Sequence, residues 1–229
     1  MTNHLDFDYE SSGFPVRRDI TEAHRASWQA IARPGPRWSG VQRVEIARQA
    51  RAARNSRGDP PWLRQGLPDT EGRIPEAACQ AARTIAADAH RIDRDWATQA
   101  IKTLGDAAYV ELGSIVATVA ALDAFAEALG RDQEPLPSAE AGTRADTASA
   151  DGVADIGAYV PMVSPFSGPN VSRALSLVPE ANRLFFTNVG AMYGGVEQSF
   201  YDLEWTGPIS RPQAELLAAR VSALNECFY

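Results

Sequence analysis

Two side chains near the end of the sequence have the types and the spacing for thiol chemistry. Glu215 precedes Cys227 by twelve residues in the segment QAELLAARVSALNECFY. A cysteine reacts as its thiolate, and a nearby carboxylate can accept or return the proton that the reaction moves. Twelve residues of one straight helix span roughly 18 Å, so the two groups can meet only if the backbone bends between them. Residues 225–226 are the expected bend, and a helix that began near Cys227 would favour its thiolate.

The same stretch resembles the approach to the active site in the AhpD-like superfamily, which includes the alkylhydroperoxidases and relatives of carboxymuconolactone decarboxylase. In the peroxidase branch of that family, a helical glutamate stands twelve residues before a Cys-x-x-Cys pair, and a histidine follows one turn later. The residues RPQAELLAARVSALNECFY carry the resemblance, with Glu215 and Cys227 at the matching positions. The sequence stops at Tyr229, within the motif, so the second cysteine and the histidine are absent.

The resemblance implies an antioxidant oxidoreductase with peroxiredoxin activity, which reduces an organic hydroperoxide with electrons from a dithiol partner. In the family the second cysteine attacks the peroxide and becomes a sulfenic acid, and the first cysteine resolves it as a disulfide. By that analogy the catalytic residues are Cys227, as resolving thiol, and Glu215, as proton relay. Because the attacking thiol is missing, the chain as given is expected to be inactive. The alternative is a non-catalytic helical assembly subunit of the same fold.

A weaker internal similarity indicates a duplicated helical unit. Residues 42–59 can be laid on residues 213–229, with Val44 at the position of the glutamate and Ser56 at that of the cysteine. This arrangement resembles large AhpD-like proteins whose N-terminal repeat has lost its thiols. The first repeat would then have structural and oligomer-forming roles only.

Hydrophobic residues recur with a helical period along most of the chain, and no stretch alternates convincingly with period two. The sequence therefore predicts an all-α fold, and the resemblance implies an AhpD-like helical bundle. The expected divisions are a thiol-less helical repeat over 1–130, a flexible connector over 131–169, and a C-terminal AhpD-like segment over 170–229, incomplete at its end. Capping residues predict helix starts at Asp19, Ser39, Pro75, Asp106 and Ser210.

The longest apolar helix is predicted over 107–129, and its apolar residues surround most of its circumference. Such a helix lies either in the centre of a bundle or at a subunit interface. Since AhpD-like proteins are generally oligomers, we expect a homodimer or a larger assembly. The segments 107–129 and 180–200 are its predicted contact elements.

Composition limits the other function classes. The net charge of −7 argues against a general nucleic-acid-binding protein, which needs a dominant basic field. One short stretch is nevertheless rich in arginine, and we interpret it as a solvent-exposed helix face. The remaining alternative is a helical regulator that uses this helix, 43–57, to hold an anionic ligand or nucleic acid. The arginines are Arg43, Arg48, Arg51, Arg54 and Arg57.

No metal or cofactor is expected, because the two cysteines and three histidines are scattered along the sequence without the spacing of a zinc site. Cys79 lies on an alanine-rich helical face and is interpreted as a small buried hydrophobic residue. No apolar run approaches the roughly 20 residues of a membrane span, and the acidic N-terminus is unlike a signal peptide. We therefore predict a cytoplasmic protein that does not bind membranes.

Overall fold

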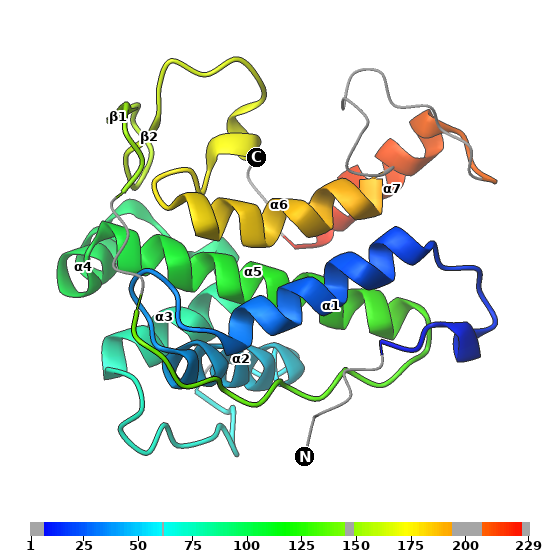
Figure 1. Cartoon of the computed structure of the whole chain (residues 1–229), viewed down its shortest axis with the longest axis horizontal. Helices are drawn as coiled ribbons and strands as arrows, with labels where there is room; N and C mark the ends of the chain where they lie inside the picture. Colours follow the sequence, from blue (N-terminus) through cyan, green and yellow to red (C-terminus); the bar gives the residue numbers. More distant parts are fainter. Residues whose placement is uncertain (1–6, 61, 145–148, 194–207, 226–229) are drawn as a thin grey trace.

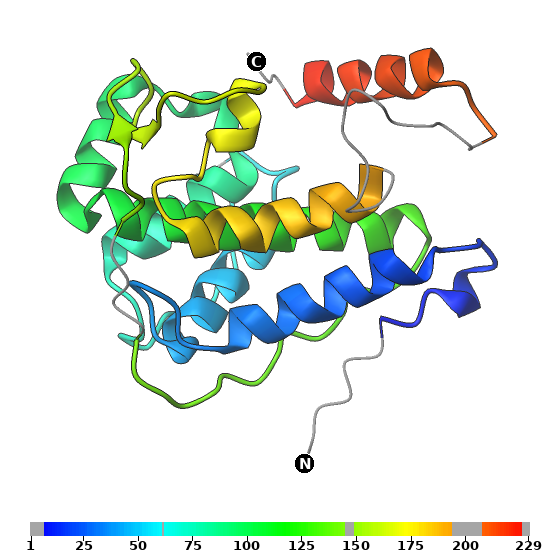
Figure 2. The ribbon, with the colours of Figure 1, turned by 45° about the horizontal axis from the view of Figure 1, so that its top comes forward.

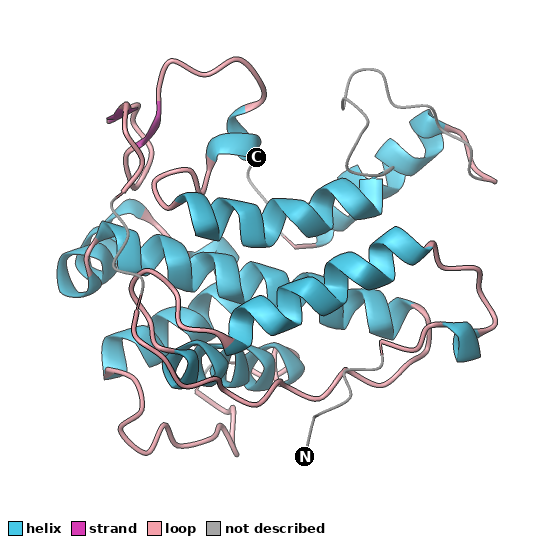
Figure 3. Cartoon of the chain, viewed as in Figure 1, coloured by secondary structure: helices cyan, strands magenta, loops and turns pink. Residues whose placement is uncertain are grey.

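The computed structural model describes residues 7–60, 62–144, 149–193 and 208–225, which fold as an all-α protein (Figures 1 and 3). The fold class predicted from the helical periodicity is confirmed. Within these ranges there are also three short 3-10 helices, Glu10–Ser12, Ala89–Arg91 and Asn170–Arg173, and one antiparallel pair of strands, β1 (Val153–Ala154) and β2 (Met162–Val163). The α-helices are α1 (Arg18–Ala32), α2 (Gly40–Asn55), α3 (Glu76–Ala87), α4 (Arg94–Leu104), α5 (Asp106–Ala128), α6 (Pro179–Tyr193) and α7 (Arg211–Leu224).

Helix α5 lies at the centre of the bundle, where it contacts α2, α3, α4 and α6 (Figure 1). Its apolar side chains are at most 3% exposed at Val110, Leu112, Ile115, Val116, Val119 and Leu122. Of the two locations left open for this helix, the centre of the bundle is correct. Other helices of the same chain cover the most buried of these side chains, and the prediction that the helix also forms a subunit contact stays a prediction.

Helix α6 packs against α1 and α5, so the predicted N-terminal repeat and the start of the C-terminal segment share contacts (Figure 2). Ala181, Leu184 and Ala191 are buried in these contacts. This face of the second predicted contact element is therefore already occupied, and positions 194–200 lie outside the described residues.

Helix α5 is also long and apolar enough to cross a membrane by length and composition alone, which corrects the expectation that no run reaches that length. Two carboxylates on this helix, those of Glu111 and Asp123, are almost fully buried and form ion pairs with arginines of α2. A helix covered by several others and ion-paired to one of them has the surroundings of a protein core.

Three arginines of the 43–57 run face α5, so its interpretation as a solvent-exposed face is wrong for them, whereas Arg57 is exposed. Positions 43, 51 and 54 share one side of a helix because they are eight and three residues apart. Arg43 pairs with Glu111. The guanidinium of Arg51 donates to both carboxylate oxygens of Asp123, at 2.9 and 2.6 Å. Arg54 pairs in the same two-pronged way with Glu127, at 2.6 and 2.8 Å.

The capping residues identify most helix starts but not all. Ser39 and Ser210 form the predicted capping boxes at the starts of α2 and α7. Asp19 is not a cap: α1 begins at Arg18, and the carboxylate of Asp19 accepts hydrogen bonds from Arg17 instead. Helix α4, capped by Asp93, had no counterpart in the sequence analysis.

The first half of the predicted connector has no regular secondary structure and runs along α1 and α2. The indole N–H of Trp28 donates to the carbonyl oxygen of Pro135, and Arg51 donates to that of Glu134, both at 2.8 Å. The backbone N–H of Glu140 donates to the carbonyl oxygen of Ala32, also at 2.8 Å. These bonds anchor the segment to the helices, and its flexibility in solution stays a prediction.

Candidate functional site

The predicted thiol site falls at the end of α7. This helix begins after the Ser210 cap and ends at Leu224, and Asn225 is its C-cap with φ −89° and ψ 8°. The helix therefore ends where the sequence analysis expected the backbone to bend. Cys227 lies outside the described residues, so of the two predicted catalytic residues the structure places only Glu215.

Glu215 lies on the surface of α7. Its side chain is 44% exposed, and its nearest cation is Arg211 one turn earlier, with 3.6 Å between Nε and Oε1. An exposed i,i+4 pair of this kind contributes only about 0.3–0.5 kcal/mol. The carboxylate is thus open to solvent, and Arg211 is the one ion-pair partner that the described residues give it.

One side of α7 carries an apolar stripe that the residues described by the structure leave uncovered. Leu217, Val221 and Leu224 are 59%, 56% and 64% exposed. Val221 and Leu224 form one wall of an open groove of about 900 Å³, and alanines of α3 and α5 form much of the opposite wall. Figure 2 shows α7 apart from the other helices, at the edge of the molecule.

Cys79, the cysteine that the structure describes, is buried on α3. Burial raises the pKa of its thiol, and its Sγ lies 3.6 Å from Oε1 of Gln49. Reactive cysteines are partly exposed and have a lowered pKa, so Cys79 has neither property. Its interpretation as a small buried hydrophobic residue is confirmed.

The structure also contains a mostly apolar cleft, with a few charged groups, that the sequence analysis missed. It has a volume of about 330 Å³ and lies between α1, α6 and the loop that joins α1 to α2. The side chain of Arg43 lines it and is fixed by two partners, the carboxylate of Glu111 and the carbonyl oxygen of Ala30, the latter at 3.3 Å. Glu111 also accepts a hydrogen bond from the backbone N–H of Arg37 at 2.7 Å.

Gly35 covers this buried ion pair. A Cβ at position 35 would overlap the guanidinium of Arg43 and the carboxylate of Glu111. A glycine is therefore needed here for close approach of the backbone, and the flanking prolines, Pro34 and Pro36, restrict the loop that carries it. These three residues follow the end of α1 and also form part of the wall of the cleft.

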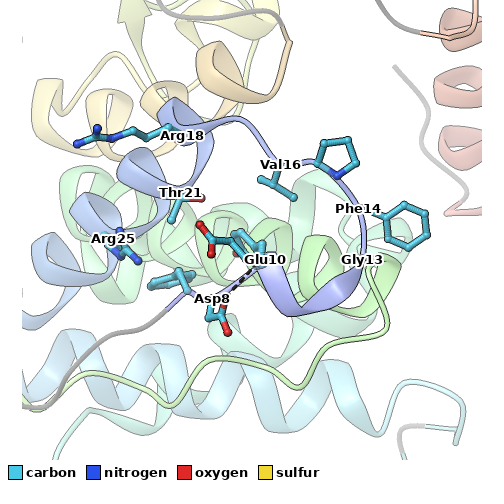
Figure 4. Close-up of a pocket in the computed structure, with 11 residues that line it drawn as sticks. Asp8, Glu10, Gly13, Phe14, Val16, Arg18, Thr21 and Arg25 are labelled. Carbon is cyan, nitrogen blue, oxygen red and sulfur yellow. Dashed lines mark hydrogen bonds between the residues drawn. The ribbon is translucent and has the colours of Figure 1, made fainter.

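A third depression, of about 990 Å³, lies between residues 7–16 and the first turns of α1 (Figure 4). Asp8 and Glu10 line it together with Thr21 and Arg25 of α1. The backbone N–H of Glu10 donates to Oδ1 of Asp8 at 3.1 Å, so the carboxylate of Asp8 already accepts a hydrogen bond within its own turn. The depression is wide and open, and nothing in it combines a nucleophile with a base.

Close to this depression, His24 is fully buried among aromatic rings. The hydroxyl of Tyr9 lies 2.7 Å from its Nδ1, and Nε2 has no hydrogen-bond partner among the described residues. Burial lowers the pKa of His24 to about 4, so the ring is neutral at pH 7. Its surroundings are those of a core residue.

The fold and its sites define an all-α helical bundle with a buried network of arginine and carboxylate side chains and a peripheral C-terminal helix. Comparison with family models, with curated proteins and with solved structures finds no match for this chain.

Proposed function

We propose that the chain is an AhpD-like protein of the thiol-dependent peroxidase branch, in which α7 carries the proton-relay carboxylate and leads to the thiol. The observation that supports this proposal is the position where α7 ends. The helix starts at the capping box of Ser210, contains Glu215, and stops at Leu224, three residues before Cys227. A change of chain direction at this point is what the carboxylate and the thiol require in order to approach each other.

The chemistry requires two thiols. Reduction of a hydroperoxide ROOH breaks the O–O bond and yields ROH and water, while two thiols lose two electrons and two protons and form a disulfide. Cys227 acts as the resolving thiol, and Glu215 moves protons between the sulfur, the leaving oxygen and solvent. The sequence has no cysteine after Cys227, and Cys79 is buried, so the chain as given should not turn over.

The test restores the missing groups. A chain extended after Tyr229 so that a cysteine occupies position 230 and a histidine position 234 should reduce cumene hydroperoxide with a dithiol donor. The unextended chain should not exceed the background rate of a free thiol. In the extended chain, Cys227→Ser should abolish turnover. Glu215→Gln should lower the rate by about 100-fold or more, the usual contribution of a general acid–base group.

Two outcomes would contradict the proposal. One is an extended chain that has native helical circular dichroism but reacts no faster than free cysteine. The other is Glu215→Gln with the rate of its parent. The matched control is Glu22→Gln, which removes an exposed carboxylate from a comparable i,i+4 pair on α1 and should leave the rate unchanged.

The second candidate function is that of a helical assembly subunit with the same fold and no catalytic activity. The uncovered stripe of Leu217, Val221 and Leu224 supports a role in assembly, because exposed apolar surface of this kind marks interfaces. Light scattering at micromolar concentration tests it: the parent chain should be a dimer or larger, and Val221→Asp should shift it toward the 24.7 kDa monomer. The anion-binding regulator is disfavoured, because carboxylates already pair with all four arginines of α2, which leaves only Arg57 of the predicted 43–57 run without an ion pair to a described residue.

A further inference from the structure

The cleft between α1 and α6 carries three polar groups with incomplete sets of partners. Glu180 has a buried Oε2 that accepts no hydrogen bond from a described residue. Arg43 has a side chain only 7% exposed, and its buried Nε has no acceptor. Arg183 is exposed on α6 and forms no ion pair within the described ranges. All three line the same cavity of about 330 Å³.

The other charges at this cleft are compensated. The guanidinium of Arg43 is neutralised by Glu111, and Arg33 at the mouth lies 3.5 Å from a carboxylate oxygen of Glu140. Two charged groups at the cleft have no ion-pair partner among the described residues: the carboxylate of Glu180, which is attracted only at longer range by Arg43, and the guanidinium of Arg183. They are three residues apart on α6, close enough to pair, yet they form no ion pair with each other.

The rest of the wall is apolar. Ala26 and Ala30 contribute from α1, Pro34 and Pro36 from the loop, and Leu184 from α6. A cavity of a few hundred Å³ with mostly apolar walls and a few polar groups is typical of small-molecule sites. Figures 1 and 2 both show α1 and α6 side by side, so two packed helices and a proline-restricted loop frame the cleft.

We propose that this cleft binds a small zwitterion with an apolar body, of the class of the apolar α-amino acids. The ammonium group pairs with the carboxylate of Glu180, and the carboxylate of the ligand accepts from the exposed guanidinium of Arg183. The apolar side chain lies against Leu184 and the alanines of α1. A half-buried carboxylate that lacks a hydrogen-bond donor is costly, and pairing with an ammonium group relieves that cost more effectively than pairing with a neutral donor.

The site is independent of the thiol at the end of the chain. No atom of α7 lines the cleft, so a Cys227→Ser chain should bind the same ligand equally well. Failure of the thiol proposal and failure of this proposal are therefore distinguishable.

The experiment titrates the full chain with L-leucine by isothermal calorimetry and by chemical-shift changes. L-leucinamide, which lacks the carboxylate, and 4-methylpentanoate, which lacks the amine, are the matched ligands. Leucine should bind saturably, and each analogue should bind at least about tenfold more weakly, because each loses a charge-assisted hydrogen bond. Glu180→Gln and Arg183→Gln should each weaken leucine binding by a similar factor. Glu22→Gln, on the exposed part of α1, should leave it unchanged.

Several results would overturn the inference. The absence of saturable leucine binding in the millimolar range is the first. Equal binding of leucine and 4-methylpentanoate would show a simple anion site, in which Glu180 has no role. Unchanged binding by Glu180→Gln would have the same meaning. If Glu180→Gln fails to fold, leucine binding by Arg183→Gln becomes the test, and unchanged binding by that variant overturns the inference. The side chain of Arg183 lies at the surface, so its replacement leaves the core intact.

Discussion

The ion pair between Arg43 and Glu111 offers the sharpest test of how the bundle is held together. Its two side chains are 7% and 1% exposed, so the pair lies almost entirely within the core. Glu111→Gln keeps the shape of the side chain and the acceptor for the N–H of Arg37, but it removes the charge that neutralises Arg43. The guanidinium then remains buried without a counter-ion.

The expected cost follows from this geometry. Removing one partner of a buried pair costs about 3–5 kcal/mol, because the remaining charge is uncompensated. Against a total stability of about 5–15 kcal/mol, this loss is a large fraction. For a chain of this size it corresponds to a melting temperature lower by roughly 10 °C.

The measurement is the free energy of unfolding from urea titration at pH 7. Two variants separate the buried charge from the loss of a carboxylate in general. Glu22→Gln, which breaks an exposed pair with Arg18, should cost less than about 1 kcal/mol. The double variant Arg43→Met with Glu111→Leu replaces both charges by apolar groups and should come close to the parent or exceed it. A cost for Glu111→Gln within about 1 kcal/mol of that for Glu22→Gln would refute the reasoning.

Three further predictions concern stability and its pH dependence. The pKa of His24 is about 4 in the folded chain against 6.5 for the free side chain, so below pH 6.5 the unfolded chain binds a proton that the folded chain excludes. Stability should therefore fall by up to about 3 kcal/mol between pH 6.5 and 4, and His24→Leu should remove this slope in urea titrations. Hydrogen bonds from Arg54 lower the pKa of Glu127 to about 2, so its contribution is complete above pH 4.5 and is lost as pH falls toward 2. Glu127→Gln should flatten the stability profile in that window, and an unchanged slope would contradict the assignment. Gly35→Ala should cost about 1–3 kcal/mol by forcing apart the ion pair beneath it, whereas Gly113→Ala, where an added Cβ meets nothing, should stabilise α5 by about 0.5–1 kcal/mol.

The elements that the sequence predicted well are those whose signals are local. The capping boxes of Ser39 and Ser210 involve residues three positions apart, and both are present in the fold. Asp19 and Glu22 show the same spacing, yet Arg17 and Arg18 engage these carboxylates in ion pairs instead. Helix α4 has local signals too, and the sequence analysis overlooked them: Asp93 caps it, and Trp96, Ala97, Ile101 and Leu104 fall on one helical face.

The arginine run shows why partners are harder to predict than elements. The spacing of positions 43, 51 and 54 indicates one helix face, but nothing near them in the sequence identifies their counter-ions. Those carboxylates lie on α5, 68 to 73 residues further along the chain. The cleft between α1 and α6 was equally hidden, because its second wall comes from α6, which is far in the sequence from α1, the loop after it and Arg43.

The three ion pairs between α2 and α5 also define the register of these two helices. Arg43, Arg51 and Arg54 meet carboxylates at three successive levels along α5, and a slip by one turn would leave buried charges unpaired at each level. Once this register is set, the backbone at Gly35 can close over the first pair, and the wall of the cleft is formed. Helix α7 takes no part in this network and buries none of its residues. The proposed thiol chemistry and the proposed ligand site therefore depend on different parts of the fold, and sequence changes in one can occur without altering the other.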